Sequence, residues 1–115
     1  MRIGGRDVVF NESFLATKDE LVEFDILVAG QKLPIEITFV EGKDADPVSW
    51  TVVQGTLKMT FSGLAKRGAL MSSLSKPYKI GVINGITFGF NFACSVSGNI
   101  YQVHFIVMSG GEYDE

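Results

Sequence analysis

The chain has 115 residues, a length that predicts a single domain over residues 1–115 with enough material for a core of its own. Apolar residues make up 46% of it and the mean hydropathy is +0.24, which excludes a disordered chain. One cysteine excludes an intramolecular disulfide, and the formal net charge of −3 argues against a nucleic-acid partner. No signal-like segment opens the chain and no apolar run reaches the length of a membrane span, so we expect a cytoplasmic protein without membrane contact.

The charges are divided along the chain. Residues 1–50 carry ten acidic and five basic side chains, whereas residues 51–111 carry five basic side chains and no acidic one. Such a division predicts two faces of opposite sign or a charged partner. The alternative is that ordinary solvated charges are segregated by chance.

The first third of the chain predicts two hairpins. Residues 1–8 predict a small hairpin around Gly4-Gly5, followed by an edge strand that is broken near Asn11-Glu12. Residues 21–40 alternate between apolar and polar side chains on both sides of a loop that we place at Gly30-Gln31. With that loop, Ile26 lies opposite Ile35.

The middle of the chain predicts a third hairpin and a long connection. Residues 48–53 and 57–61 alternate around a turn at Gln54-Gly55, which pairs Trp50 with Met59 and makes Trp50 a predicted centre of the core. Residues 62–77 have no strand pattern. The spacing of their apolar residues is compatible with a short helix over residues 69–75.

The last third predicts the strands that organise the fold. Phe88 to Val96 and Tyr101 to Val107 alternate in phase around Gly98-Asn99, so Phe92 pairs with Phe105 on one apolar face. Before them, residues 78–82 form a strand that we join to the next one by a three-residue loop ending at Gly85. The hairpins together predict an all-β protein of about eight antiparallel strands, arranged as a β-sandwich or jelly roll, with a small closed β-barrel as the alternative.

Three groups of residues are candidates for function. Glu23, Asp25 and Glu36 form an acidic group, because the predicted loop sets Asp25 directly across from Glu36. Like charges in that position are destabilising unless a cation or a basic group lies between them. This group is a candidate divalent-cation site or docking face for a basic partner, with solvated carboxylates relieved by Lys18 or Lys32 as the alternative.

The second group surrounds the only histidine. The predicted register places His104 on the face opposite the aromatic core, near Asn91, Ser95 and Gln102. These four residues are candidates for an end pocket that binds a ligand or moves a proton. One histidine and one core-facing cysteine do not supply a zinc site, and we expect neither a metal nor a cofactor.

The third group is the long connection, where the candidate contact residues are Leu64, Lys66, Arg67, Leu70, Met71 and Leu74. No nucleotide-binding or catalytic motif is present in the sequence. We therefore expect a non-enzymatic β-sandwich that binds another macromolecule, in the first place a protein, in the manner of bacterial or phage accessory and inhibitor proteins. Self-association into a homo-oligomer is expected because the apolar content exceeds what one small core hides. The alternative is a ligand-binding or enzymatic domain that uses His104.

Overall fold

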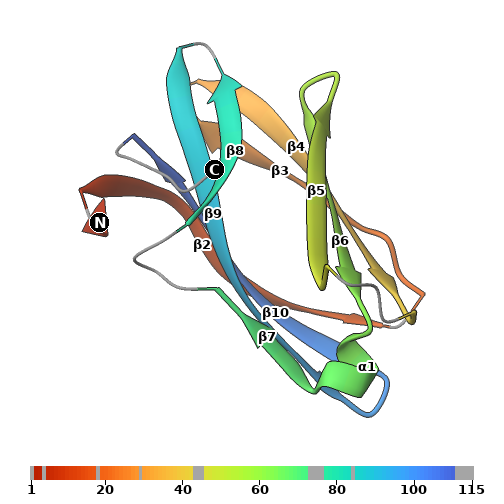
Figure 1. Cartoon of the computed structure of the whole chain (residues 1–115). Helices are drawn as coiled ribbons and strands as arrows, with labels where there is room; N and C mark the ends of the chain where they lie inside the picture. Colours follow the sequence, from red (N-terminus) through yellow and green to blue (C-terminus); the bar gives the residue numbers. More distant parts are fainter. Residues whose placement is uncertain are drawn as a thin grey trace.

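The computed structural model describes residues 2–3, 5–17, 19–28, 30–42, 46–72, 77–83 and 85–110 and has two β-sheets packed face to face (Figure 1). Sheet A contains β1 (Arg2–Ile3), β2 (Arg6–Thr17), β7 (Ala69–Met71), β8 (Tyr78–Ile83), β9 (Ile86–Ser97) and β10 (Ile100–Ser109). Sheet B contains β3 (Val22–Val28), β4 (Gln31–Val40), β5 (Val48–Val53) and β6 (Thr56–Ser62). No strand in the described ranges pairs with a strand of the other sheet, so the fold is a sandwich and the predicted fold class is confirmed.

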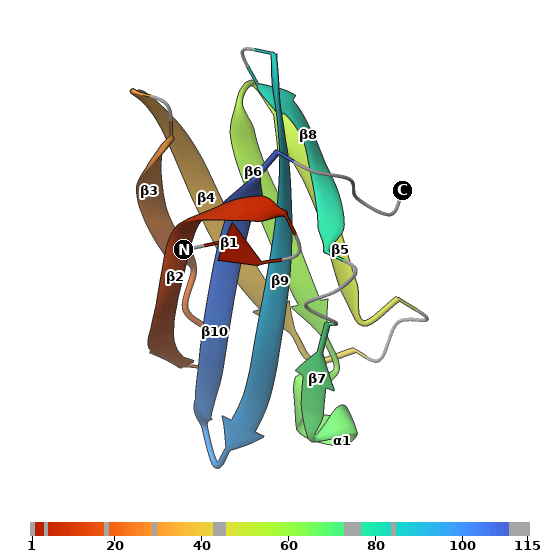
Figure 2. The same ribbon diagram turned by 90° about the vertical axis from the view of Figure 1, so that its left-hand side faces the viewer.

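The β9–β10 hairpin is the centre of sheet A and has the predicted register. Phe92 lies opposite Phe105, and Cys94 lies opposite Val103. Gly98 has a φ of 62° while Asn99 has a negative φ, as expected for the type II′ turn that suits such hairpins. Figure 2 shows both strands running the length of sheet A.

Strand β2 pairs along the other side of β10, and its irregularity lies earlier than predicted. Its partners run from Ser109 back to Ile100, with the register shifting between Val107 and Met108. The shift leaves Val9 as an extra residue in a β-bulge, whereas the strand is continuous through Asn11-Glu12. The predicted small hairpin before it is confirmed by the pairing of β1 with the start of β2.

The predicted three-residue loop between β8 and β9 is wrong. Ile83 pairs with Ile86, so the connection has two residues, and this short loop alone would turn Lys79 toward the core. A β-bulge between Lys79 and Gly81 restores the phase, so that Tyr78 still lies opposite Phe90 and Ile80 is buried.

In sheet B the predicted register of the β3–β4 hairpin is wrong by two residues. Val28 pairs with Gln31, and Ile26 therefore lies opposite Leu33 instead of Ile35. A shift of two keeps every side chain on its predicted face, so the apolar pattern could not distinguish the two registers. Gln31, which the prediction placed in the loop, belongs to the ladder.

Strands β5 and β6 form the predicted hairpin, with Trp50 opposite Met59. Strand β6 also pairs with β4, and this pair is parallel, which corrects the expectation of an entirely antiparallel sandwich. As a consequence β6 lies between β4 and β5, and β5 becomes an edge strand.

The chain crosses from sheet B to sheet A through a single helical turn, α1 (Leu64–Arg67), followed by β7. The helix predicted over residues 69–75 is wrong, because residues 69–71 pair with β9 and residues 73–76 lie outside the described residues. Two glycines with positive φ, Gly63 and Gly68, flank the turn. This geometry lets the chain reverse sharply on both sides of α1.

Aromatic side chains from both sheets make one shared core. Phe61 packs on Phe92 with ring centroids 5.2 Å apart, and Phe24 packs on Phe105 at 6.4 Å. Trp50 is half-buried and not central, which corrects its predicted position. It lies at one margin of the sandwich, where its ring contacts Phe90 and its Nε1 donates a hydrogen bond to the carbonyl of Lys79.

Candidate functional site

The outer face of sheet A differs from the outer face of sheet B in charge. We call the part of the outer face of sheet A nearer the β9–β10 turn the neutral face, because its described outward positions carry no Asp, Glu, Lys or Arg. These positions are Asn11, Ser13, Leu15, Thr17, Ala69, Met71, Asn91, Ala93, Ser95, Ser97, Ile100, Gln102, His104 and Ile106. The outward positions of sheet B instead include Glu23, Asp25, Lys32, Glu36 and Lys58. Apart from Asn91 and Ile106, which are buried, these described residues form an exposed sheet surface without Asp, Glu, Lys or Arg, which is unusual in a protein that presents it only to water.

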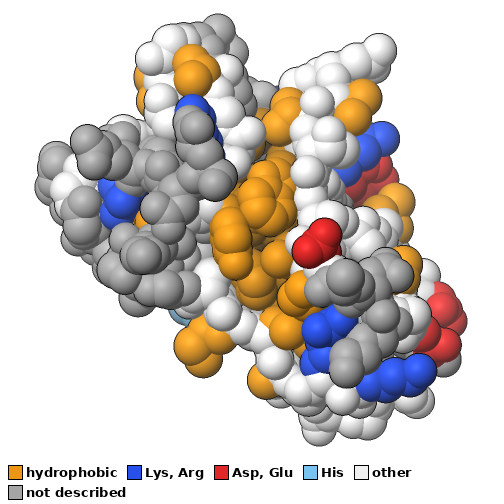
Figure 3. Space-filling model, in the orientation of Figure 1, with side chains coloured by type: hydrophobic (Ala, Val, Ile, Leu, Met, Phe, Trp, Pro, Cys, Tyr) orange, Lys and Arg blue, Asp and Glu red, His pale blue; other side chains and the backbone are white. Residues whose placement is uncertain are grey.

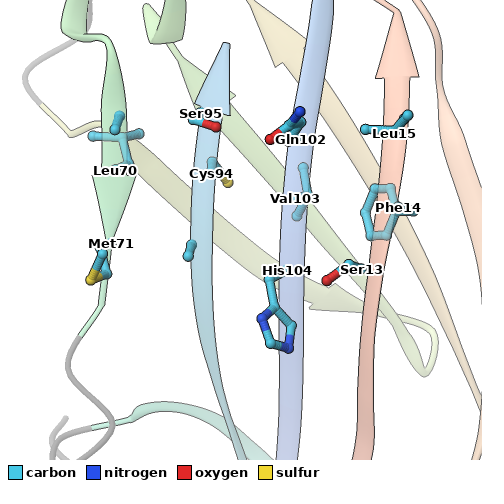
Figure 4. A pocket seen from close by; sticks show the side chains of 12 residues that line it. Ser13, Phe14, Leu15, Leu70, Met71, Cys94, Ser95, Gln102, Val103 and His104 are labelled. Carbon is cyan, nitrogen blue, oxygen red and sulfur yellow. The ribbon is translucent and has the colours of Figure 1, made fainter. Parts of the chain in front are cut away.

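A hollow of about 430 Å³ lies on this neutral face between β2 and β7, and we call it the β2–β7 hollow (Figure 4). Its floor includes Ala93 and Ser95 from β9, and Gln102 and His104 from β10. The small side chains on β9 create the depression, since the neighbouring strands carry larger ones.

Two exposed apolar side chains stand on opposite sides of the β2–β7 hollow. Leu15 on β2 is 66% exposed, and Met71 on β7 is 80% exposed. Both point outward by strand phase, since Leu15 lies opposite Gln102 and Met71 lies opposite Ala93. Leu15 and Met71 therefore form apolar walls on either side of the floor of the hollow, which carries polar side chains such as Ser95 and Gln102.

A smaller hollow of about 180 Å³ continues the same surface and shares Met71, Ala93 and His104 with the first. Asn91 lies beside it and is only 2% exposed. Its Nδ2 donates a hydrogen bond of 3.0 Å to the Ser72 hydroxyl, which itself donates to the carbonyl of Phe92. Ser72 thus fixes Asn91 and extends the pairing of β7 with β9 by one residue.

The structure brings the four histidine-group residues together on this face. Ser95, Gln102 and His104 line the β2–β7 hollow, and Asn91 with His104 lines the smaller one. The surface is the broad side of the sheet and not the predicted end of the sandwich. His104 is exposed and hydrogen-bonds through Nε2 to the Oδ1 of Asn11, with no carboxylate among the residues that line either hollow.

The candidate residues of the long connection are separated by the structure. Leu64 is buried in the core, and Leu70 packs partly against it. Lys66 is exposed, Arg67 is half-buried, and Leu74 lies outside the described residues. Of the described residues in this group, Leu70 and Met71 line the β2–β7 hollow, and only Met71 has an outward position.

The acidic group lies on the opposite sheet, where Glu23, Asp25 and Glu36 line one hollow of about 260 Å³. The corrected register sets Glu23, and not Asp25, directly across from Glu36, while Asp25 faces Pro34. On its other side Glu36 forms an ion pair of 3.5 Å with Lys58. A basic group from the neighbouring strand therefore already partly neutralises this cluster.

The described residues show no group of three or more His, Cys, Asp or Glu side chains arranged to hold a metal ion. Cys94 is buried beneath the β2–β7 hollow, on the core side of the sheet, and burial raises the pKa of its thiol to about 12. The thiol is therefore protonated at neutral pH and is a poor nucleophile.

Sequence reasoning did not identify Leu15, Ser13 and Asn11 as parts of the site. All three come from β2, whose register with β10 depends on the bulge at Val9. The usable signal was the adjacency of Phe14 and Leu15, since the alternation of side chains along a strand turns one of two neighbouring apolar residues outward.

Within the described ranges, no helix is long and apolar enough to cross a membrane. The chain matches no protein-family model, no curated protein and no solved structure, so the geometry of the neutral face carries the functional argument.

Proposed function

We propose that the protein is a non-enzymatic interaction module that binds another protein, in the cytoplasm, through the outer face of sheet A. The observation that carries the proposal is the neutral face itself, which places Leu15 and Met71 in solvent around a hollow. Exposed apolar side chains gathered on one rimmed surface are a mark of protein–protein contact sites. On the outer face of sheet B the exposed Leu27 lies among charged side chains instead, with Lys32 directly opposite it.

The chemistry of the β2–β7 hollow favours an uncharged partner surface. An apolar side chain of the partner fits between Leu15 and Met71, where its burial removes apolar area from water on both sides. Ser95, Gln102 and His104 supply hydrogen-bond donors and acceptors to the partner's neutral polar groups. A charged partner group would be desolvated there without an ion-pair partner.

The test compares two leucines of nearly equal exposure on opposite sheets. Leu15 is 66% exposed beside the hollow, and Leu27 on β3 is 69% exposed on sheet B. We expect Leu15→Glu to abolish retention of a partner that the wild-type protein and Leu27→Glu both retain from cell extract, as read by quantitative mass spectrometry. The expected reason is that Leu15→Glu brings an unpaired charge into the contact, and the binding loss is about tenfold or more.

Met71→Glu provides an independent second arm from the opposite wall of the hollow. If Leu15→Glu and Leu27→Glu retain the same proteins, the neutral face is not the contact. Circular dichroism of each variant shows whether a loss of binding reflects a loss of fold.

The volume of the β2–β7 hollow also supports a second candidate, a binding site for a small neutral ligand. About 430 Å³ is within the range of ligand pockets, and His104 with Gln102 supplies directional polar groups. Ala93→Leu would fill the floor of the hollow from an outward position. A small molecule found by NMR screening should shift the His104 ring resonances in the wild type and fail to do so in Ala93→Leu.

A further inference from the structure

The free edge of β5 is the only edge in the described part of the chain that has no protective feature. β5 is the terminal strand of sheet B, and its sequence from Val48 to Val53 contains no charged residue, proline or glycine. Native proteins usually protect such edges with charges, prolines, bulges or short strands. The other edges have these protections: Glu23 and Asp25 on β3, Glu12 and a bulge on β2, Lys79 and a bulge on β8, and lengths of two and three residues in β1 and β7.

The hydrogen-bond pattern identifies which residues face the open side. Ser62 donates a backbone hydrogen bond to the carbonyl of Pro47, the residue opposite it in the register. Because bonded pairs alternate in an antiparallel ladder, Ser49, Thr51 and Val53 also turn their backbone groups toward β6. The N–H and C=O groups of Val48, Trp50 and Val52 therefore point away from sheet B. Figure 1 shows β5 at this margin, next to β8 of the other sheet.

The side chains at this edge add apolar exposure to the free backbone. Val52 and Val53 are 40% and 44% exposed near the end of the hairpin. In Figure 3 apolar side chains line the opening between the two sheets on the side where β5 lies. A strand that pairs here would gain both backbone hydrogen bonds and apolar contact.

We propose that two copies of the chain pair antiparallel through β5, across a twofold axis at Trp50, and join their four-stranded sheets into one. The occupant is a second copy because the strand is self-complementary about Trp50. In this register Val48 bonds to Val52 of the other copy, and Trp50 bonds to its own equivalent, so all three edge-facing residues gain partners. The flanking charge does not oppose the pairing, since Asp46 lies across from Gln54 of the second copy.

The outer face of the joined sheet is compatible with this register. Ser49 lies directly opposite Thr51 of the second copy, and both side chains are exposed in one copy alone. Hydroxyl pairs in such positions are favourable, and no like charges meet. Antiparallel pairing of β3 with its own equivalent would instead bring its carboxylates together.

The decisive experiment uses two double variants that share Thr51→Glu and differ only in the sign of the charge introduced at position 49. In Ser49→Glu/Thr51→Glu, the carboxylate at position 49 faces the carboxylate at position 51 of the other copy, and the dimer dissociation constant should rise by about tenfold or more. In Ser49→Lys/Thr51→Glu, an ammonium group at position 49 faces that carboxylate, and the dimer should form at least as well as in the wild type. The Thr51→Glu side chain lies next to Lys58 in its own sheet, so the fold tolerates it in both variants.

Sedimentation velocity over a range of concentrations gives the result. The proposal predicts a concentration-dependent dimer for the wild type and for Ser49→Lys/Thr51→Glu, and a monomer for Ser49→Glu/Thr51→Glu. A wild type that is monomeric at every concentration overturns it. So does a dimer that dissociates in Leu15→Glu but not in Ser49→Glu/Thr51→Glu, because self-association would then use the neutral face of sheet A.

Disulfide trapping tests the register independently. A chain carrying Ser49→Cys mixed with a chain carrying Thr51→Cys should cross-link rapidly under mild oxidation, because directly opposed residues bring their Cβ atoms within disulfide reach. Each variant alone should cross-link more slowly, since residue 49 does not face its own equivalent. Equal rates in all three samples would exclude the Trp50-centred register.

Discussion

Cys94 has an unusual position at the residue scale, because it lies directly under the candidate site but faces the core. Its side chain is 3% exposed, and its neighbours on β9, Ala93 and Ser95, form the floor of the β2–β7 hollow. A thiol in that place reports on the integrity of the sheet without taking part in the surface chemistry. Because side chains alternate between the two faces of a strand, Ala93 and Ser95 face the hollow while Cys94 faces the core.

We predict that Cys94 does not react with a thiol reagent at neutral pH while the protein is folded. Burial raises the pKa of the thiol to about 12, so almost no thiolate forms, and the sheet shields the sulfur. The release of the reagent's chromophore should begin only at denaturant concentrations that unfold the chain. Rapid labelling of the native protein would contradict the buried position.

The same pKa predicts a loss of stability at alkaline pH. In the unfolded chain the pKa of the thiol is its ordinary 9.0, whereas burial raises this pKa to about 12 in the folded chain. Between these values the unfolded state binds fewer protons, so the free energy of unfolding falls with pH, by at most about 1.4 kcal/mol per unit. In Cys94→Ala the free energy of unfolding, measured by urea titration at several pH values, should lack this fall with pH. A pH dependence equal to that of the wild type would contradict the prediction.

At the scale of elements, the β3–β4 hairpin has a like-charge pair in its corrected register. Glu23 lies opposite Glu36, and Lys58 contacts Glu36 from the other side. We expect Glu23→Gln to raise the free energy of unfolding by a few tenths to about 1 kcal/mol, because it removes the repulsion and leaves the ion pair intact. Urea unfolding monitored by circular dichroism measures the difference.

Asp25→Asn is the matched control, since Asp25 faces Pro34 and is only diagonal to Glu36. Its stabilisation should be smaller than that of Glu23→Gln. A larger stabilisation by Asp25→Asn than by Glu23→Gln would instead support the register with its loop at Gly30-Gln31, in which Asp25 faces Glu36.

The hairpins also show which parts of the fold the sequence could predict. The registers at Gly98-Asn99 and Gln54-Gly55 were correct, because each predicted two-residue turn is the one that the hairpin has. The β3–β4 register was wrong because a shift of two preserves the faces, and the β8–β9 loop was wrong because a bulge at Ile80 compensates for it. Local patterns do not encode such compensations.

Of the candidate site, only the residues on the β9–β10 hairpin could be predicted from the sequence. His104, Ser95 and Gln102 share a face because they belong to the correctly predicted β9–β10 hairpin. Leu15 and the outward position of Met71 depend on strands that pair with that hairpin from distant parts of the chain. Alternation within one strand cannot identify its neighbour, so the walls of the hollow had to come from the structure.

At the scale of the whole molecule, aromatic contacts hold the two sheets together at both margins. Phe10 of β2 stacks on Phe24 of β3 with ring centroids 5.3 Å apart. At the other margin Trp50 of β5 lies 4.9 Å from Tyr78 of β8, measured between ring centroids. Neither sheet therefore has a core of its own.

We predict that the two sheets unfold in one cooperative transition. Trp50 is the only tryptophan and lies between the sheets, so its fluorescence reports their separation, while far-ultraviolet circular dichroism reports the strands themselves. The two signals should have the same midpoint in urea. A fluorescence transition at lower urea would mean that the sheets separate before they unfold.

The pairing of β2 with β10 has a consequence for the order in which the protein can be made. β2 leaves the ribosome before the other long strands of sheet A, yet apart from the short β1 its only neighbour in the described sheet is β10, which follows all of them. Sheet B needs nothing beyond Ser62 to complete its own ladders. During translation the nascent chain can thus assemble sheet B, and the ring of Phe24 on β3 is then available to Phe10 and Phe14. The backbone edge of β2 that pairs with β10 stays open until Ser109 has been made, so this ladder is completed late in synthesis.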